Sequence, residues 1–144
     1  MRLSTFYKNN RKKLFQTLTK GAKICYNNQD NSKRRGKNMK KCKITVMRIT
    51  RYPDLMAKYE NPITHACDLR EGQVFVANGC IRPDGLCESA WESMFPFVKE
   101  LAQGGGNFYD GWMKNERSAM ISCNDGFRPV SFYIEALDED ADEQ

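Results

Sequence analysis

The longest helical pattern in the chain lies between residues 82 and 106. Its apolar side chains recur at spacings of three and four residues, which places them on one stripe of an α-helix. The stripe consists of Cys87, Ala90, Trp91, Met94, Val98 and Leu101. Asp84 is expected to cap the first turn, and the glycines at 104–106 supply a left-handed residue that ends the helix. Pro96 predicts a kink, or a split into two helices, because it removes a backbone donor.

Four alternating stretches predict β-strands, at residues 41–50, 73–77, 118–123 and 129–136. A short helix at 55–59 is predicted after the first strand. Asn124-Asp125-Gly126 indicates a tight turn between the last two strands. Alternation places Cys42, Ile44 and Val46 on the core face of the first strand. In the last strand it places Val130, Phe132 and Ile134 on the core face, opposite Ala119, Ile121 and Cys123.

This order of elements predicts an α+β fold, a small, mainly antiparallel sheet with one long helix packed on one face. The chain has 144 residues, enough for a single core, and we assign that core to a domain at 39–137. The segment 138–144 contains five acidic residues and is expected to be a disordered tail.

Charge is unevenly distributed along the chain. Residues 1–38 contain 11 Lys and Arg against a single acid, whereas residues 39–144 contain 12 against 17. This basic extension is expected to be disordered or not part of the native protein. Arg34-Arg35-Gly36 can be encoded by a purine run that resembles a ribosome-binding site, which predicts that translation starts at Met39. Binding to nucleic acid is expected only if residues 1–38 are translated.

The apolar residues also bear on where the protein works. No run of about 18 apolar residues occurs, so we expect no membrane span and no membrane partner. The basic start lacks an uninterrupted apolar segment, so a secretory signal is not expected. We therefore place the protein in the cytoplasm, where its six cysteines should be reduced thiols.

The cysteines are the main candidates for chemistry. Cys67, Cys87 and Cys123, with Cys80 or Cys42 as a fourth, offer enough thiolates for zinc or an iron–sulfur cluster. The chain has no C-x-x-C pair, and buried cysteines also serve as small hydrophobic residues. For Cys42 we prefer packing to metal binding, and for Cys123 we weigh the two interpretations equally.

Two of these candidates differ from simple packing residues because they lie in or beside turns. Cys87 falls where the positive end of the helix dipole would attract a thiolate, with Arg82 nearby, although its place in the apolar stripe also explains it. Cys67 lies in a loop with His65, the only histidine. A nucleophilic Cys-His pair would have to use His65, but a lone loop histidine is more often solvated.

A second candidate site involves Arg128, Asp125 and Trp112. The preferred interpretation of Asp125 and Arg128 is structural, as residues of a hairpin. The alternative is that Arg128 holds an anion or a protein partner while Asp125 orients it. Trp112 belongs to an aromatic loop after the glycines, which could cover a pocket.

From residue 39 to about 136 the chain resembles a family of small, uncharacterised bacterial and archaeal proteins of about 100 residues that is frequent in anaerobes. The resemblance rests on Gly85-x-Cys87-x-x-Ala90-Trp91, on Cys123-x-Asp125-Gly126-x-Arg128-Pro129-Val130, and on shorter matches around Cys42 and Cys67. Many members start near the equivalent of Met39, and Cys80 has no obvious counterpart among them. The resemblance implies relatives and no reaction.

Together these patterns favour a small cytoplasmic protein whose cysteines bind a metal or do redox chemistry, as an accessory protein in anaerobic metabolism. The alternative is a non-enzymatic module that binds a protein partner or a small anion through Arg128. None of the patterns names a reaction or a substrate.

Overall fold

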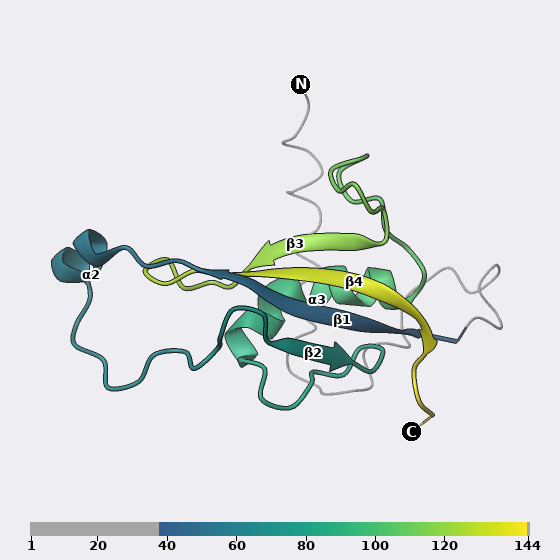
Figure 1. Cartoon of the computed structure of the whole chain (residues 1–144), viewed down its shortest axis with the longest axis horizontal. Coiled ribbons are helices and arrows are strands. Elements are labelled where there is room, and N and C mark those ends of the chain that lie inside the picture. The colour runs from purple at the N-terminus through teal and green to yellow at the C-terminus, as the bar shows by residue number, and fades with distance from the viewer. Residues whose placement is uncertain (1–37, 144) are drawn as a thin grey trace, which may run out of the picture. The chain divides into compact units, whose positions relative to one another are not determined.

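The computed structural model describes residues 38–143 (Figure 1). The predictions for the basic extension and for a start at Met39 fall almost entirely on residues 1–37, outside the described part. The described elements are, in chain order, β1 (Lys40–Ile49), α2 (Pro53–Tyr59), β2 (Val74–Ala77), α3 (Glu88–Ala102), β3 (Ser118–Ser122) and β4 (Val130–Asp140).

The four strands form one antiparallel sheet in the order β2-β1-β4-β3. With the two helices of the described residues, this sheet confirms the predicted α+β class. The predicted cross-strand pairs are confirmed as well, since Ala119 lies opposite Ile134 and Ile121 lies opposite Phe132. β1 lies inside the sheet between β2 and β4, although it comes first in the described chain (Figure 1).

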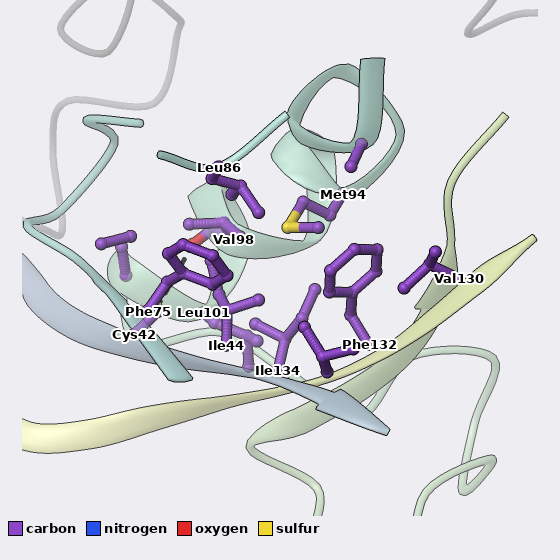
Figure 2. Packing of buried hydrophobic residues seen from close by; sticks show 14 residues of the cluster. Cys42, Ile44, Phe75, Leu86, Met94, Val98, Leu101, Val130, Phe132 and Ile134 are labelled. Carbon is purple, nitrogen blue, oxygen red and sulfur yellow. Dashed lines mark hydrogen bonds between the residues drawn. The ribbon is translucent and has the colours of Figure 1, made fainter. Parts of the chain in front are cut away.

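The core lies between the inward side chains of the strands and the buried side of α3. Cys42, Ile44 and Val46 of β1 are at most 1% exposed, as their alternation predicts. They share one cluster with the buried residues of α3, which are Ala90, Met94, Val98, Leu101 and Ala102. In Figure 2 the ring of Phe132 points toward Met94, across the space between sheet and helix.

Pro96 lies inside α3, which continues from Glu88 to Ala102 as one helix. The predicted split is therefore wrong. Pro96 removes one backbone donor, but fully buried residues on both sides of it, Met94 and Val98, hold the two halves against the same core.

The acidic tail was expected to be disordered, and for Asp138 to Asp140 this is wrong, because these residues form the end of β4. Basic residues on neighbouring segments neutralise them. Lys40 Nζ lies 2.6 Å from Asp140 Oδ1, and Arg117 Nη1 lies 2.8 Å from Asp138 Oδ1. Hydrogen bonds from these two side chains hold the pKa values of Asp138 and Asp140 below their usual range. The acidic side chains at the end of β4 therefore form ion pairs with basic residues of neighbouring segments, and their charge does not prevent the strand from joining the sheet.

Gly106 joins α3 to the loop before β3 and requires glycine for two reasons. Its φ is +155°, and an added Cβ would overlap the carbonyl oxygen of Glu116, which also accepts a 2.7 Å hydrogen bond from the Asn107 N–H. We expect Gly106→Ala to lower the free energy of unfolding by more than about 1 kcal/mol in urea titrations. Gly126→Ala is the control, because no atom lies within 4 Å of its added Cβ. Equal stability of the two variants would contradict this expectation.

Candidate functional site

A cavity of about 260 Å³ lies where three connecting segments meet. These segments are the loop between α2 and β2, the turn into α3, and the loop between β3 and β4. The cavity is lined by Ile63, His65, Ala66, Cys67, Leu69, Cys87, Ser89, Ala90, Cys123, Asp125, Arg128, Val130 and Phe132. The structure therefore brings the three predicted cysteines together with His65, Asp125 and Arg128 in what we call the thiol cavity.

Cys123 is held at the cavity wall by the backbone of the next strand. Its N–H donates a 3.0 Å hydrogen bond to the Val130 carbonyl, and the Val130 N–H donates to Cys123 Sγ at 3.3 Å. The side chain is half-buried and packs against the core. This pair of bonds fixes both the position and the direction of the sulfur.

Cys87 is the N-cap residue of α3, one position before the first helical residue, Glu88. Asp84 does not cap the helix, since the cap position belongs to Cys87, whose carbonyl accepts the Trp91 N–H at 2.9 Å. The preceding turn is anchored by Leu86, which is 1% exposed and whose carbonyl accepts a 2.8 Å hydrogen bond from Arg82. Cys87 itself is exposed, at the N-terminal end of α3.

The two rigid cysteine segments are linked to each other. Asn124, next to Cys123, donates a side-chain hydrogen bond of 3.5 Å to the carbonyl of Ser89 in the first turn of α3. At that length the bond is weak. It nevertheless places the start of the β3–β4 loop beside the N-terminal end of α3, and Cys87 and Cys123 from these two segments both line the thiol cavity.

Cys67 and His65 belong to a different kind of segment. Residues 60–73 contain no helix or strand, and both side chains are exposed. Burial raises the pKa of the Cys67 thiol, the backbone of Leu69 lowers it by hydrogen bonding, and the charges of Cys87 and Cys123 raise it further.

Arg128 closes the cavity beside Asp125, and its side chain is only 8% exposed. Its guanidinium donates to both carboxylate oxygens of Glu60, at 2.5 and 2.6 Å, and to Asp125 Oδ2 at 3.2 Å. The hydrogen bonding of the Arg128 guanidinium to Glu60, which accepts, is the main cause of a raised pKa for Arg128. An incoming anion would have to share these donors with two carboxylates. Glu60 was not among the candidate residues, because it lies 68 positions from Arg128 and no local pattern marks the pair.

The loop between β3 and β4 is longer than the predicted tight turn. β3 ends at Ser122 and β4 begins at Val130. Within the loop Asp125 Oδ1 accepts hydrogen bonds from the N–H groups of Phe127, at 2.8 Å, and Arg128, at 3.0 Å. Asp125 thus shapes the loop by accepting hydrogen bonds from nearby backbone N–H groups with its side chain, as in an Asx turn. A two-residue turn would not need such a side chain.

Asp125 makes the stability of the fold vary with pH in the acidic range. Burial raises its pKa, but the two N–H groups and Arg128 outweigh this effect, so the folded-state pKa lies below the usual value. The charged form therefore stabilises the fold above the unfolded-state pKa of about 3.9, and this contribution is lost as pH falls through the lower folded-state value. We expect Asp125→Asn to be less stable than the native chain at pH 7 and the difference to shrink below pH 4. A difference that is independent of pH in urea titrations would contradict this.

Trp112 does not line the thiol cavity. It is 44% exposed and lies edge to face with Tyr109, with ring centroids 5.3 Å apart. Its loop leads into the first residue of β3, whereas Asp125 and Arg128 follow the other end of that strand. The structure therefore separates Trp112 from the residues with which it was grouped.

The two cysteines considered as a fourth ligand also lie elsewhere. Cys42 is fully buried between β1 and α3, its Sγ is 3.8 Å from the Val98 carbonyl oxygen, and burial raises its pKa to about 12. Cys80 lies in the turn after β2, where Asn78 accepts a 2.8 Å hydrogen bond from the Asp142 N–H. That turn is beside the far end of β4, roughly 30 Å from Val130 at about 3.3 Å per residue.

Within residues 38–143, no group of three or more His, Cys, Asp or Glu side chains has donor atoms already close enough to hold a metal ion. A search of the same residues also finds no helix with the length and apolar character to span a membrane. Comparison of the chain with protein-family models, with curated proteins and with solved structures gives no match. The family resemblance of the sequence therefore stays a prediction.

Proposed function

We propose that this chain is a small cytoplasmic protein that uses Cys67, Cys87 and Cys123 to bind a metal or to do redox chemistry, as an accessory protein. The observation that supports the proposal is the single cavity that all three cysteines line. They come from three separate segments, so local sequence spacing does not explain their proximity. In this proposal α3 is the one long helix that covers a face of the sheet, and its N-terminal end presents Cys87.

Metal binding is the first form of this chemistry. Thiolates are soft ligands that favour zinc and iron–sulfur clusters over harder cations. Cys87 and Cys123 are held by rigid backbone, and Cys67 faces them from a loop. This combination suits a site in which two fixed ligands accept the ion and a third closes on it.

Thiol redox chemistry is the second form. Two cavity thiols would lose two protons and two electrons and form a disulfide. The electrons would pass to a low-molecular-weight disulfide, whose S–S bond would break to give two thiols. Cys67 is exposed and carried by the loop, so it is the partner that would move to reach Cys87 or Cys123.

The test is metal and sulfide analysis of the full chain purified without oxygen, together with its absorption spectrum. Metal binding predicts stoichiometric zinc, or iron with sulfide and a visible charge-transfer band, and its loss in Cys67→Ser, Cys87→Ser and Cys123→Ser. Redox chemistry predicts a metal-free chain in which oxidised glutathione removes two titratable thiols. The control is Cys80→Ser, which lies outside the cavity. A metal-free chain that forms no disulfide would overturn the proposal.

Binding of a protein partner or a small anion through Arg128 is the second candidate function. It is favoured by the position of Arg128, which lines the same cavity with its side chain almost buried. Inorganic phosphate is a suitable probe, because the forked guanidinium of arginine can donate two parallel hydrogen bonds to its oxygens. Phosphate binding by the native chain that is lost in Arg128→Leu and retained in the three serine variants would support this function in place of thiol chemistry.

A further inference from the structure

We infer that His65 is the fourth ligand of a tetrahedral zinc site formed with Cys67, Cys87 and Cys123, and that the loop at 61–68 closes to complete it. This inference rests on the metal-binding form of the proposed function. It identifies the ligand set, Cys₃His, which is one of the common sets of structural zinc sites.

The position of His65 suits it to be the fourth ligand. His65 is the only imidazole in the chain and it lines the thiol cavity together with all three cysteines. The cysteines considered as a fourth ligand lie too far away. Cys80 is near the opposite end of β4, and Cys42 is fully buried in the core between β1 and α3. Cys42 could reach the cavity only by leaving its fully buried position in the core.

Carboxylates are the other potential donors in the cavity, and Asp125 is the one that lines it. Its Oδ1 already accepts two backbone N–H groups, and its Oδ2 accepts from Arg128. Zinc binding by Asp125 would break these contacts and leave the Arg128 charge with a single partner in a nearly buried position. His65 is exposed and its donors are committed to no such network.

The loop that carries His65 and Cys67 is fixed at both ends and irregular between them. At one end Glu60 is bound to Arg128, and at the other Leu69 packs against the core. The eight residues between these anchors contain no helix or strand. Closure of this stretch over Cys87 and Cys123 therefore needs no change in the sheet or in α3. The proposed site requires this closure, because no group of three or more His, Cys, Asp or Glu side chains within residues 38–143 is arranged to hold a metal ion.

Chain geometry also fits two ligands from this loop. His65 and Cys67 are separated by one residue, Ala66, which also lines the cavity. Both ligands can reach one ion from an irregular loop because no backbone hydrogen-bond ladder of a strand or helix constrains their directions. The pair would then face the rigid pair formed by Cys87 and Cys123.

The test uses the full chain, freed of metal without oxygen and titrated with Zn²⁺ or Co²⁺ alone. X-ray absorption of the zinc form should give three sulfurs at about 2.3 Å and one nitrogen at about 2.0 Å. In His65→Ala the nitrogen should disappear and Zn²⁺ affinity should fall at least about tenfold, the lower bound seen when the surroundings of a metal site are disturbed. In His65→Cys tight binding should return, with four sulfurs and a changed Co²⁺ spectrum.

The outcomes separate this inference from the proposed function. Zinc bound by three sulfurs with equal affinity in the native chain and His65→Ala would overturn the role of His65 and leave metal binding by the cysteines intact. Failure of the native chain to bind either ion would remove the metal-binding form itself. Cys80→Ser is the matched control and should bind zinc like the native chain. Loss of binding in that variant would also overturn the inference.

Discussion

Phe132→Ala is expected to lower the free energy of unfolding by about 3 to 5 kcal/mol, the usual cost of removing a buried aromatic ring. Phe132 is fully buried in β4, and its ring points from the sheet toward Met94 of α3 (Figure 2). It also lines the thiol cavity. Its loss would therefore remove core packing and enlarge the floor of the candidate site in one step.

This cost is large against the total stability of about 5 to 15 kcal/mol that a domain of this size has. Urea unfolding followed by tryptophan fluorescence measures it, with an unchanged dependence on urea showing that the folded state is retained. Phe132→Leu, which keeps an apolar side chain, should cost less than Phe132→Ala. Ser131 precedes Phe132 and lies on the opposite side of the strand, so Ser131→Ala should change the free energy of unfolding by no more than about 0.5 kcal/mol. A cost of less than about 1 kcal/mol for Phe132→Ala would show that the ring does not hold sheet and helix together.

The parts of the fold that local periodicity determines could be predicted from the sequence. Alternation identified Ile44 and Phe132 as core residues because each strand buries one side. The spacing of three and four residues did the same for Met94 and Val98 in α3. Strand order could not be predicted in this way, because alternation shows which side of a strand is buried and carries no information about its neighbours.

The failures have a common physical cause, which is pairing between residues far apart in sequence. The acidic residues 138–144 were expected to form a disordered tail, but Lys40 and Arg117 on neighbouring segments form ion pairs with Asp140 and Asp138. Pro96 was expected to kink the helix or to split it, and the split does not occur, because the packing of α3 against the core outweighs the loss of one backbone hydrogen bond. In both cases the local sequence shows the unfavourable contribution, and the long-range contacts that offset it become visible only in the folded chain.

The same distinction applies to the candidate site. Cys67, Cys87 and Cys123 could be selected because each lies in or near a predicted turn or strand end, and the structure places them around one cavity. Glu60 could not be selected, because only the folded chain brings it to Arg128. Trp112 was grouped with Arg128 from residue type alone, and the intervening strand β3 keeps the two apart.

Cys42 is expected to make the protein lose stability at alkaline pH. Burial raises its pKa to about 12 in the folded chain, against an unfolded-state value of about 8.5. Above the unfolded-state value the unfolded chain releases the thiol proton while the folded chain keeps it. Each pH unit between about 9 and 12 should therefore lower the free energy of unfolding by about 1.4 kcal/mol through this residue alone.

The measurement compares the native chain with Cys42→Ala in urea titrations at pH 9 and pH 10.5. Lysines and the other cysteines titrate in both proteins, so the difference isolates Cys42. The native chain should lose about 2 kcal/mol more than the variant over this interval. Equal losses would mean that the Cys42 thiol ionises as readily in the folded chain as in the unfolded one. Burial would then not be what governs ionisation of this thiol.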